Sequence, residues 1–266
     1  MEVLHPMPRR SFGAGAPLAG QRSLPAEVAV ALSFNGTTQA VMLASPGDLI
    51  DFAYGFSMTE GIAAPDEIDS VVVVQAEQGI DLQIWLRGGA EARLAKRRRT
   101  MAGPVGCGLC GIDSLAEALR QPPALPASAF RMRPAEVMAA IASLPAAQPL
   151  HDATRAVHAA GFWAGGLLAV REDVGRHNAL DKLIGHLLRK PQQQGAVLLT
   201  SRVSIDMVQK VCALGAPLLI AVSAPTAQAV AMADAAGLTL IALARPDRFE
   251  VFTHSERLIE ESADVA

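Results

Sequence analysis

The chain has 266 residues, of which 51% are hydrophobic and 18% charged. This composition can bury a sizeable core and excludes intrinsic disorder as the state of the whole chain. Only 4% of the residues are aromatic and the formal net charge is −3, which argues against a nucleic-acid binder or a general polyanion binder. Three cysteines, an odd number, do not suit a secreted disulfide scaffold. We therefore expect a cytoplasmic protein.

Two stretches require a check for targeting or membrane insertion. Residues 211–233 carry no charge and are long enough to span a bilayer. Pro217 and Pro225 interrupt this stretch, which favours a buried strand, a turn and a helix over a membrane span. Residues 1–26 contain Arg9-Arg10, but no apolar run follows that is long enough for an export signal. We expect a disordered leader there and no contact with a membrane.

Residues 27–121 have the pattern of a small α+β domain. Asn35-Gly36, a strong hairpin signal, lies within an alternating stretch at residues 27–43. Apolar residues at helical spacing then predict a helix that ends near Gly61 and begins at Ser45-Pro46, with Ser45 as its cap. The other expected elements are strands at 70–75 and 80–87 and a short helix at 113–120.

The second half of the chain has a different pattern. A proline-rich linker is expected at 122–133, and residues 134–266 alternate short apolar runs with helical stretches. This alternation predicts an α/β domain with a mostly parallel sheet flanked by helices. The apolar runs are residues 164–170, 196–199, 217–222 and 238–243, and the helical stretches are residues 177–189, 204–214 and 226–236.

The pair of Cys107 and Cys110 is the short sequence feature that says most about the chemistry of the protein. Two thiols at this spacing can share a metal, form a reversible disulfide or pass sulfur between them, because the flanking glycines allow both to face one side of a loop. Basic residues at 96–99 lie close in sequence, and positive charge stabilises the reactive thiolate. A structural zinc site needs four ligands, and Cys212 has the pattern of a core residue. We expect no permanently bound metal.

Polar residues follow several of the expected strands. Arg176 and His177 stand where a strand gives way to a helix, and Arg202 stands at the next such point. Arg245 and Arg248 follow the last apolar run. The carboxyl ends of parallel strands share one edge of a sheet, where helix N-termini and guanidinium groups can bind phosphate. The sequence thus predicts a phosphate-binding rim.

The same positions have a purely structural alternative. Asp173 can cap the following helix, and His177 can pair with Asp181 one turn further on. Ser204 and Thr226 can likewise be ordinary helix caps. On the residues alone, both interpretations stay open.

Several motifs together resemble the FdhD family of formate dehydrogenase accessory sulfurtransferases, over about residues 27–258. Two departures from that pattern are Thr200-Ser201-Arg202, where the family usually has Ser-Gly-Arg, and Arg155-Ala156, where it usually has Gly-Gly. The motifs are Arg97-Arg98-Arg99-Thr100, Cys107-Gly108-Leu109-Cys110-Gly111, Val157-His158-Ala159-Ala160, Glu172-Asp173-Val174-Gly175-Arg176-His177-Asn178-Ala179-Leu180-Asp181-Lys182, Ser201-Arg202-Val203-Ser204 and Met207-Val208-Gln209-Lys210.

The resemblance implies a sulfur carrier. Such a protein receives sulfane sulfur from a cysteine desulfurase as a cysteine persulfide and delivers it to the molybdenum or tungsten bis-molybdopterin guanine dinucleotide cofactor of formate dehydrogenase. Cys107 would carry the persulfide, and Cys110 would support its transfer or resolve it. A cytidine-deaminase-like, three-layer C-terminal domain and a homodimer are also implied. The cofactor-binding stretch would be Leu243, Ala244, Arg245, Pro246, Asp247 and Arg248.

Two other functions stay open on the residues alone. One is a zinc-dependent nucleotide hydrolase or deaminase that uses Cys107, Cys110 and His158. A zinc deaminase would have a glutamate two residues after its histidine, where this chain has Ala160. The other is a non-catalytic binding module whose cysteines are incidental.

Overall fold

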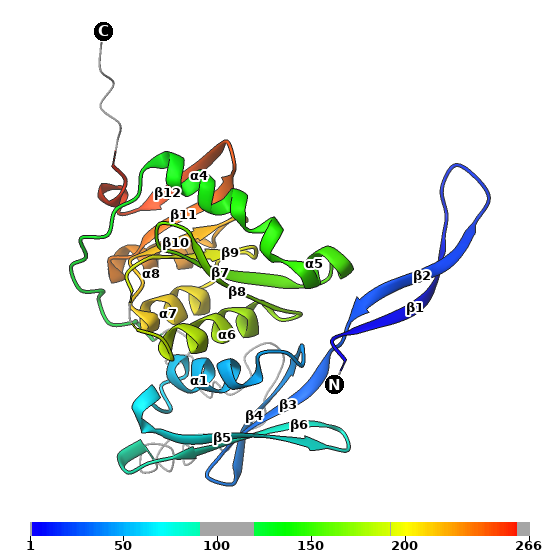
Figure 1. Ribbon diagram of the computed structural model, residues 1–266. Coiled ribbons are helices and arrows are strands. Elements are labelled where there is room, and N and C mark those ends of the chain that lie inside the picture. The colour runs from blue at the N-terminus through cyan, green and yellow to red at the C-terminus, as the bar shows by residue number, and fades with distance from the viewer. Residues whose placement is uncertain (1, 91–119, 192, 260–266) are drawn as a thin grey trace.

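The computed structural model describes residues 2–90, 120–191 and 193–259. Within these ranges the chain forms a projecting β-arm, a small α+β module and a larger α/β module (Figure 1). Cys107 and Cys110, the basic run at 96–99 and the short helix expected at 113–120 lie outside the described residues.

The arm is an antiparallel hairpin of β1 (Leu4–Ser11) and β2 (Leu18–Pro25). The expectation of a disordered leader over residues 1–26 is therefore wrong. Backbone pairing between the two strands orders this stretch, and its many prolines, glycines and exposed side chains conceal that pairing in the sequence. Near its root, the arm is fixed to the body because the Arg22 guanidinium donates to the Thr154 carbonyl oxygen at 3.1 Å.

The α+β module is a four-stranded sheet with strand order β4-β3-β6-β5 and one helix on one face. Asn35 and Gly36 form the expected hairpin turn, with φ values of 46° and 76°. The predicted helix is present, but it begins at Leu49, and Ser45 does not cap it: the Ser45 hydroxyl accepts from the backbone N–H of Val174. The elements are β3 (Val28–Phe34), β4 (Thr37–Ala44), α1 (Leu49–Thr59), β5 (Ile68–Ala76) and β6 (Gly79–Leu86).

The α/β module has three layers around a six-stranded sheet of order β12-β11-β10-β9-β7-β8. Helices α6, α7 and α8 pack on one face and α4 on the other (Figure 1). The strands are β7 (His158–Trp163), β8 (Leu167–Asp173), β9 (Ala196–Leu199), β10 (Leu218–Ala221), β11 (Thr239–Arg245) and β12 (Arg248–Thr253). The helices are α4 (Pro134–Ser143), α5 (Pro149–Thr154), α6 (Arg176–Leu188), α7 (Ile205–Leu214) and α8 (Ala227–Ala236).

This sheet is mixed, and the expectation of a mostly parallel sheet is corrected. Only β9, β10 and β11 pair in parallel, whereas β7 and β12 form antiparallel pairings with their neighbours. β7 forms a hairpin with β8, and β12 forms a hairpin with β11. The apolar runs of the sequence did not predict β7 or β12. Residues 211–233 form the end of α7, then β10 and most of α8. Among the described helices, none is long and apolar enough to cross a membrane.

Helices α1 and α6 join the two modules through direct backbone contact. A Cβ atom on Gly55 would overlap the carbonyl oxygen of Asp181, and one on Gly185 would overlap the carbonyl oxygen of Asp51. Glycine at both positions is therefore required for this approach, because any side chain would push the helices apart.

Buried ion pairs accompany this contact. Lys182, whose side chain is fully buried, donates to a carboxylate oxygen of Asp173 at 2.5 Å and to the Ser45 carbonyl at 2.8 Å. Lys210 donates to both carboxylate oxygens of Asp181 at 2.9 Å. The Thr59 hydroxyl donates to the same Asp181 at 2.8 Å. Both pairs belong to the α/β module, and each is hydrogen-bonded by one residue of the α+β module, Ser45 or Thr59.

A third cluster of charged side chains surrounds Asp51, in the first turn of α1. The carboxylate of Asp51 accepts from Arg171 at 2.8 Å and from Arg189 at 2.7 Å. Cations of the α/β module therefore neutralise an acid of the α+β module at their interface.

Substitution of Gly185 by alanine tests the close contact of the two helices. We expect Gly185→Ala to lower the free energy of unfolding by about 1–3 kcal/mol, because the new methyl group overpacks the contact. Helix propensity alone would raise stability by about 1 kcal/mol, so the sign distinguishes the two effects. Urea denaturation measures the change. Gly47→Ala is the control, because a Cβ at Gly47 meets no atom within 4 Å. A more stable Gly185→Ala variant would contradict the contact.

Removal of Lys182 tests the buried ion pair. Lys182→Met leaves the Asp173 carboxylate buried without its cation, and we expect a loss of about 3–5 kcal/mol in the free energy of unfolding. The matched variant Lys190→Met removes an exposed lysine and should stay within about 0.5 kcal/mol of the parent chain. Equal effects in the two variants, measured by thermal and urea unfolding, would show that the pair is unimportant.

Candidate functional site

Four strands of the six-stranded sheet run in the same direction and end at one edge. β9, β10 and β11 are parallel, and β8 has the same direction because both β8 and β9 are antiparallel to β7. The predicted polar residues follow these strands at that edge, which is where open α/β sheets bind ligands. We call this edge the carboxyl rim, formed by residues 174–177, 200–202, 223–225 and 245–248.

His177 and Asp206 bring the first turns of α6 and α7 together on the rim. The Nε2 atom of His177 contacts a carboxylate oxygen of Asp206. Burial lowers the pKa of His177 to about 4, although the neighbouring Asp206 carboxylate acts in the opposite direction. The alternative pairing of His177 with Asp181 is not formed, because Asp181 is bound by Lys210.

The candidate caps of the neighbouring helices differ in their contacts. Thr226 caps α8, since its hydroxyl accepts from the backbone N–H of Ala229 at 3.2 Å. Ser204 stands at the N-cap of α7, yet its hydroxyl oxygen is buried and makes no hydrogen bond within the described part of the chain. Arg202, in the turn between β9 and α7, is exposed. An exposed cation thus precedes the N-terminus of α7 at this turn of the rim.

His158 is the first residue of β7 and pairs in register with Asp173. Burial lowers its pKa, and the charges of Arg176 and His151 act in the same direction. Within the described ranges, no group of three His, Cys, Asp or Glu side chains could hold a metal ion. The zinc alternative also requires Cys107 and Cys110, which lie outside those ranges.

One residue of each departure from the family pattern has a defined place in the fold. Arg155 ends α5 in the left-handed region at φ 59°, a conformation that favours glycine. Thr200 contributes its side chain, whose oxygen accepts from the backbone N–H of Ala159 at 2.9 Å. This bond ties the start of β7 to the rim.

The last strand of the rim is distorted at its carboxyl end. β11 shifts register between Ala242 and Arg245, and Leu243 has a positive φ of 52°. A β-bulge of this kind redirects side chains, and leucine in this conformation is strained, a combination common at functional sites. No sequence pattern predicts this distortion, because leucine carries no preference for positive φ.

A cavity of about 210 Å³ lies at this distortion. The Arg245 guanidinium donates to the Val222 carbonyl at 2.6 Å, which holds it across the end of β10. Arg248 is exposed, 3.4 Å from the Asp247 carboxylate. The cavity is lined by Leu243, Arg245, Arg248, Phe249 and Glu250. Three of the six residues at 243–248 therefore line one cavity.

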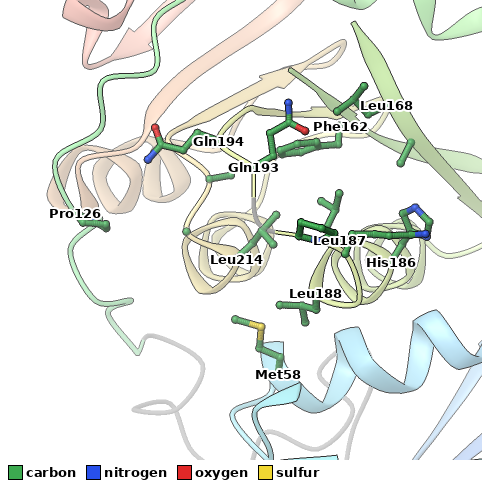
Figure 2. A pocket seen from close by; sticks show the side chains of 15 residues that line it. Met58, Pro126, Phe162, Leu168, His186, Leu187, Leu188, Gln193, Gln194 and Leu214 are labelled. Carbon is green, nitrogen blue, oxygen red and sulfur yellow. The ribbon is translucent and has the colours of Figure 1, made fainter. Parts of the chain in front are cut away.

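A larger cavity of about 670 Å³ lies at the opposite edge of the sheet, beside the ends of α6 and α7 (Figure 2). Figure 2 shows Phe162, Leu187 and Leu214 around it. It contains none of the site residues predicted from the sequence, and its apolar lining did not stand out from the core pattern.

Known proteins are similar to this chain over most of its length. The model of the FdhD/NarQ family matches residues 25–259. Sulfur carrier protein FdhD of Agrobacterium fabrum is 52% identical over 256 residues, which is 94% of each chain. Sulfur carrier protein FdhD of Brucella abortus is 54% identical over 244 residues, covering 90% of this chain and 91% of the relative.

A solved structure agrees with these relatives. A crystal structure described as a formate dehydrogenase accessory protein from Desulfotalea psychrophila has a TM-score of 0.77 and 26% identity to this chain. The match covers 97% of this chain and 100% of that one. By sequence and by fold, this chain belongs to the FdhD/NarQ family.

Proposed function

We propose that this chain is a cytoplasmic sulfur carrier for the maturation of formate dehydrogenase. It accepts sulfane sulfur from a cysteine desulfurase on Cys107 and passes it to the molybdenum or tungsten bis-molybdopterin guanine dinucleotide cofactor. The names of its relatives, sulfur carrier and formate dehydrogenase accessory protein, support the general role. The spacing of Cys107 and Cys110 supports the chemistry, and a reducing compartment keeps both thiols available.

The single observation that carries the cofactor part of the proposal is the arginine-lined cavity on the carboxyl rim. A guanine dinucleotide contains phosphates, which bind well to guanidinium groups and to the N–H groups at helix N-termini. Arg245 and Arg248 line the cavity, and the N-termini of α6, α7 and α8 open onto the same edge. Arg176 and Arg202 stand at two of those helix starts. We assign the phosphates to this rim and the guanine end to the hollow beside Leu243.

The proposed transfer to Cys107 is a thiol exchange without net redox change. The Cys107 thiolate attacks the outer sulfur of the donor persulfide, a new S–S bond forms on Cys107, and the donor cysteine leaves as a thiolate. Attack of Cys110 on the Cys107 sulfur then releases the outer sulfur as hydrosulfide. The electron pair for the new S–S bond comes from the Cys110 thiolate, the outer sulfur leaves with the pair of the broken persulfide bond, and a Cys107–Cys110 disulfide remains. A thiol reductant of the reducing compartment then returns both cysteines to thiols.

Cys212 is not a candidate for this chemistry. Its side chain is buried in the core beneath the sheet, and burial raises the pKa of its thiol to about 12. A thiol in this state is neither deprotonated nor accessible at neutral pH.

Intact-mass spectrometry tests the carrier role. After incubation with a cysteine desulfurase and cysteine, we expect the parent chain to gain the mass of one sulfur atom, removable by a thiol reductant. Cys107→Ala should abolish this gain because the nucleophile is absent. Cys212→Ala is the matched control and should leave it unchanged. A persulfide that persists in Cys107→Ala, or that forms on no variant, would contradict the assignment of Cys107.

Calorimetric titration with guanosine diphosphate tests the rim. We expect Arg248→Ala to weaken binding by about ten- to a hundredfold, since loss of one charge-assisted hydrogen bond costs about 1.5–3 kcal/mol. Added salt should weaken binding to the parent chain. Arg131→Ala, which removes an exposed arginine elsewhere, serves as the control. Equal affinities in the three chains would refute the phosphate site.

A further inference from the structure

The cavity at the distorted end of β11 is lined by a carboxylate as well as by two guanidinium groups. The carboxylate is that of Glu250, which lies outside the stretch at residues 243–248. In the proposed function Arg245 and Arg248 bind phosphate, a role that suits guanidinium groups. A carboxylate repels phosphate, so Glu250 must meet a different part of the ligand.

Glu250 lies on the edge strand β12 and points to the face of the sheet that α8 covers. It is the register partner of Ala242 on β11, whose side chain is buried beneath the helices of that face. Register partners in an antiparallel pair point to the same face. Arg248 lies two residues earlier on β12 and therefore also points there, about 7 Å away along the strand. A cation and an acid thus stand side by side on one face of the hairpin.

The Glu250 side chain is free to bind a ligand. It is exposed, and within the described part of the chain it makes no hydrogen bond or ion pair. The neighbouring acid Asp247 differs in both respects, because it contacts Arg248 at 3.4 Å and does not line the cavity. A carboxylate without a partner on a cavity wall can accept hydrogen bonds from a ligand that offers donors.

The size and walls of the cavity suit one flat ring system. Cavities that hold drug-sized ligands measure about 300–1,000 Å³, and this one is smaller, at about 210 Å³. Leu243 and Phe249 give it apolar surface, and Phe249 also packs against the core on the α4 side of the sheet. The cavity therefore suits a single base, with the sugar and the phosphates outside it.

Guanine is the base whose edge matches a carboxylate. Its N1–H and its 2-amino group are adjacent donors, and the two oxygens of a carboxylate can accept from both at once. Adenine has an acceptor at N1 and no 2-amino group. With adenine in the cavity, the Glu250 carboxylate would face a lone pair and lose its hydrogen bonds to water without replacement.

We propose that Glu250 selects guanine by accepting hydrogen bonds from its N1–H and its 2-amino group. The inference rests on the proposed function, in which this cavity holds the guanine end of the cofactor, and it adds the residue that distinguishes guanine from other bases. Arg248 then stands one step nearer the turn of the hairpin, and Arg245 extends across the end of β10. Base, sugar and phosphates thus follow one another from Glu250 to the rim.

Calorimetric titration of the full chain with nucleoside diphosphates tests the selectivity. We expect GDP to bind at least about tenfold more tightly than ADP. Inosine diphosphate, which keeps N1–H and lacks the 2-amino group, should bind with intermediate affinity. Equal affinities for GDP and ADP would overturn the role of Glu250 and leave the phosphate site of the proposed function standing. A parent chain that binds none of the three nucleotides would overturn both.

The variant Glu250→Gln should change the preferred base. Its amide oxygen still accepts from N1–H, but its NH₂ group opposes the 2-amino group of guanine. The same NH₂ group can donate to the carbonyl oxygen that xanthine carries at this position. We expect Glu250→Gln to bind GDP about tenfold more weakly than the parent chain and xanthosine diphosphate about tenfold more tightly. A purely structural role of Glu250 would weaken both nucleotides alike.

Two further variants complete the experiment. Glu27→Gln removes the same charge at an exposed position of the α+β module and should change neither affinity. Asp247→Asn makes the equivalent change in the carboxylate beside Arg248 and should not strengthen binding of xanthosine diphosphate. Circular dichroism confirms that each variant is folded. An unchanged base preference in Glu250→Gln, or a switch to xanthine in Asp247→Asn, would overturn the proposal.

Discussion

The buried ion pair between Asp173 and Lys182 is the interaction on which the arrangement of the site depends. Burial of two charges costs free energy unless hydrogen bonds also satisfy their remaining donors and acceptors. Here the backbone N–H of Ser45 donates to Asp173 at 2.9 Å, and Lys182 donates to the Ser45 carbonyl. The loop before α1 thus completes a pair that belongs to the α/β module. Because α6 begins three residues after Asp173, the same pair fixes the helix start that carries Arg176.

Glycine contact and charge act together at this module interface. Gly55 and Gly185 allow the backbones of α1 and α6 to touch, which brings Asp51 within reach of Arg171 and Arg189. A wider helix separation would leave that carboxylate without its partners. The acids Asp51 and Glu60, at the two ends of α1, are therefore neutralised where that helix faces the large module.

Sequence patterns predicted the elements that are long and buried on one side. The Asn35-Gly36 hairpin and helices α6, α7 and α8 are confirmed because apolar period and turn chemistry agree there. β7 and β12 were missed because their pairing is set by tertiary contacts with neighbouring strands. The bulge at Leu243 was missed for another reason: its backbone conformation depends on the hydrogen bonds around it, and the residue type does not encode it.

The proposed sulfur chemistry depends on the contact between the two modules, because the segment that contains both cysteines connects them. Residues 91–119, which include Cys107 and Cys110, connect Ala90, buried in the core of the α+β module, to Arg120. The Arg120 carbonyl accepts from the side chain of Gln209 on α7 at 2.7 Å. One end of the segment is thus fixed to the α+β module and the other to a helix whose N-terminus lies on the rim. Any change that separates α1 from α6 will move one end relative to the other, so stability of the interface and sulfur delivery should be lost together.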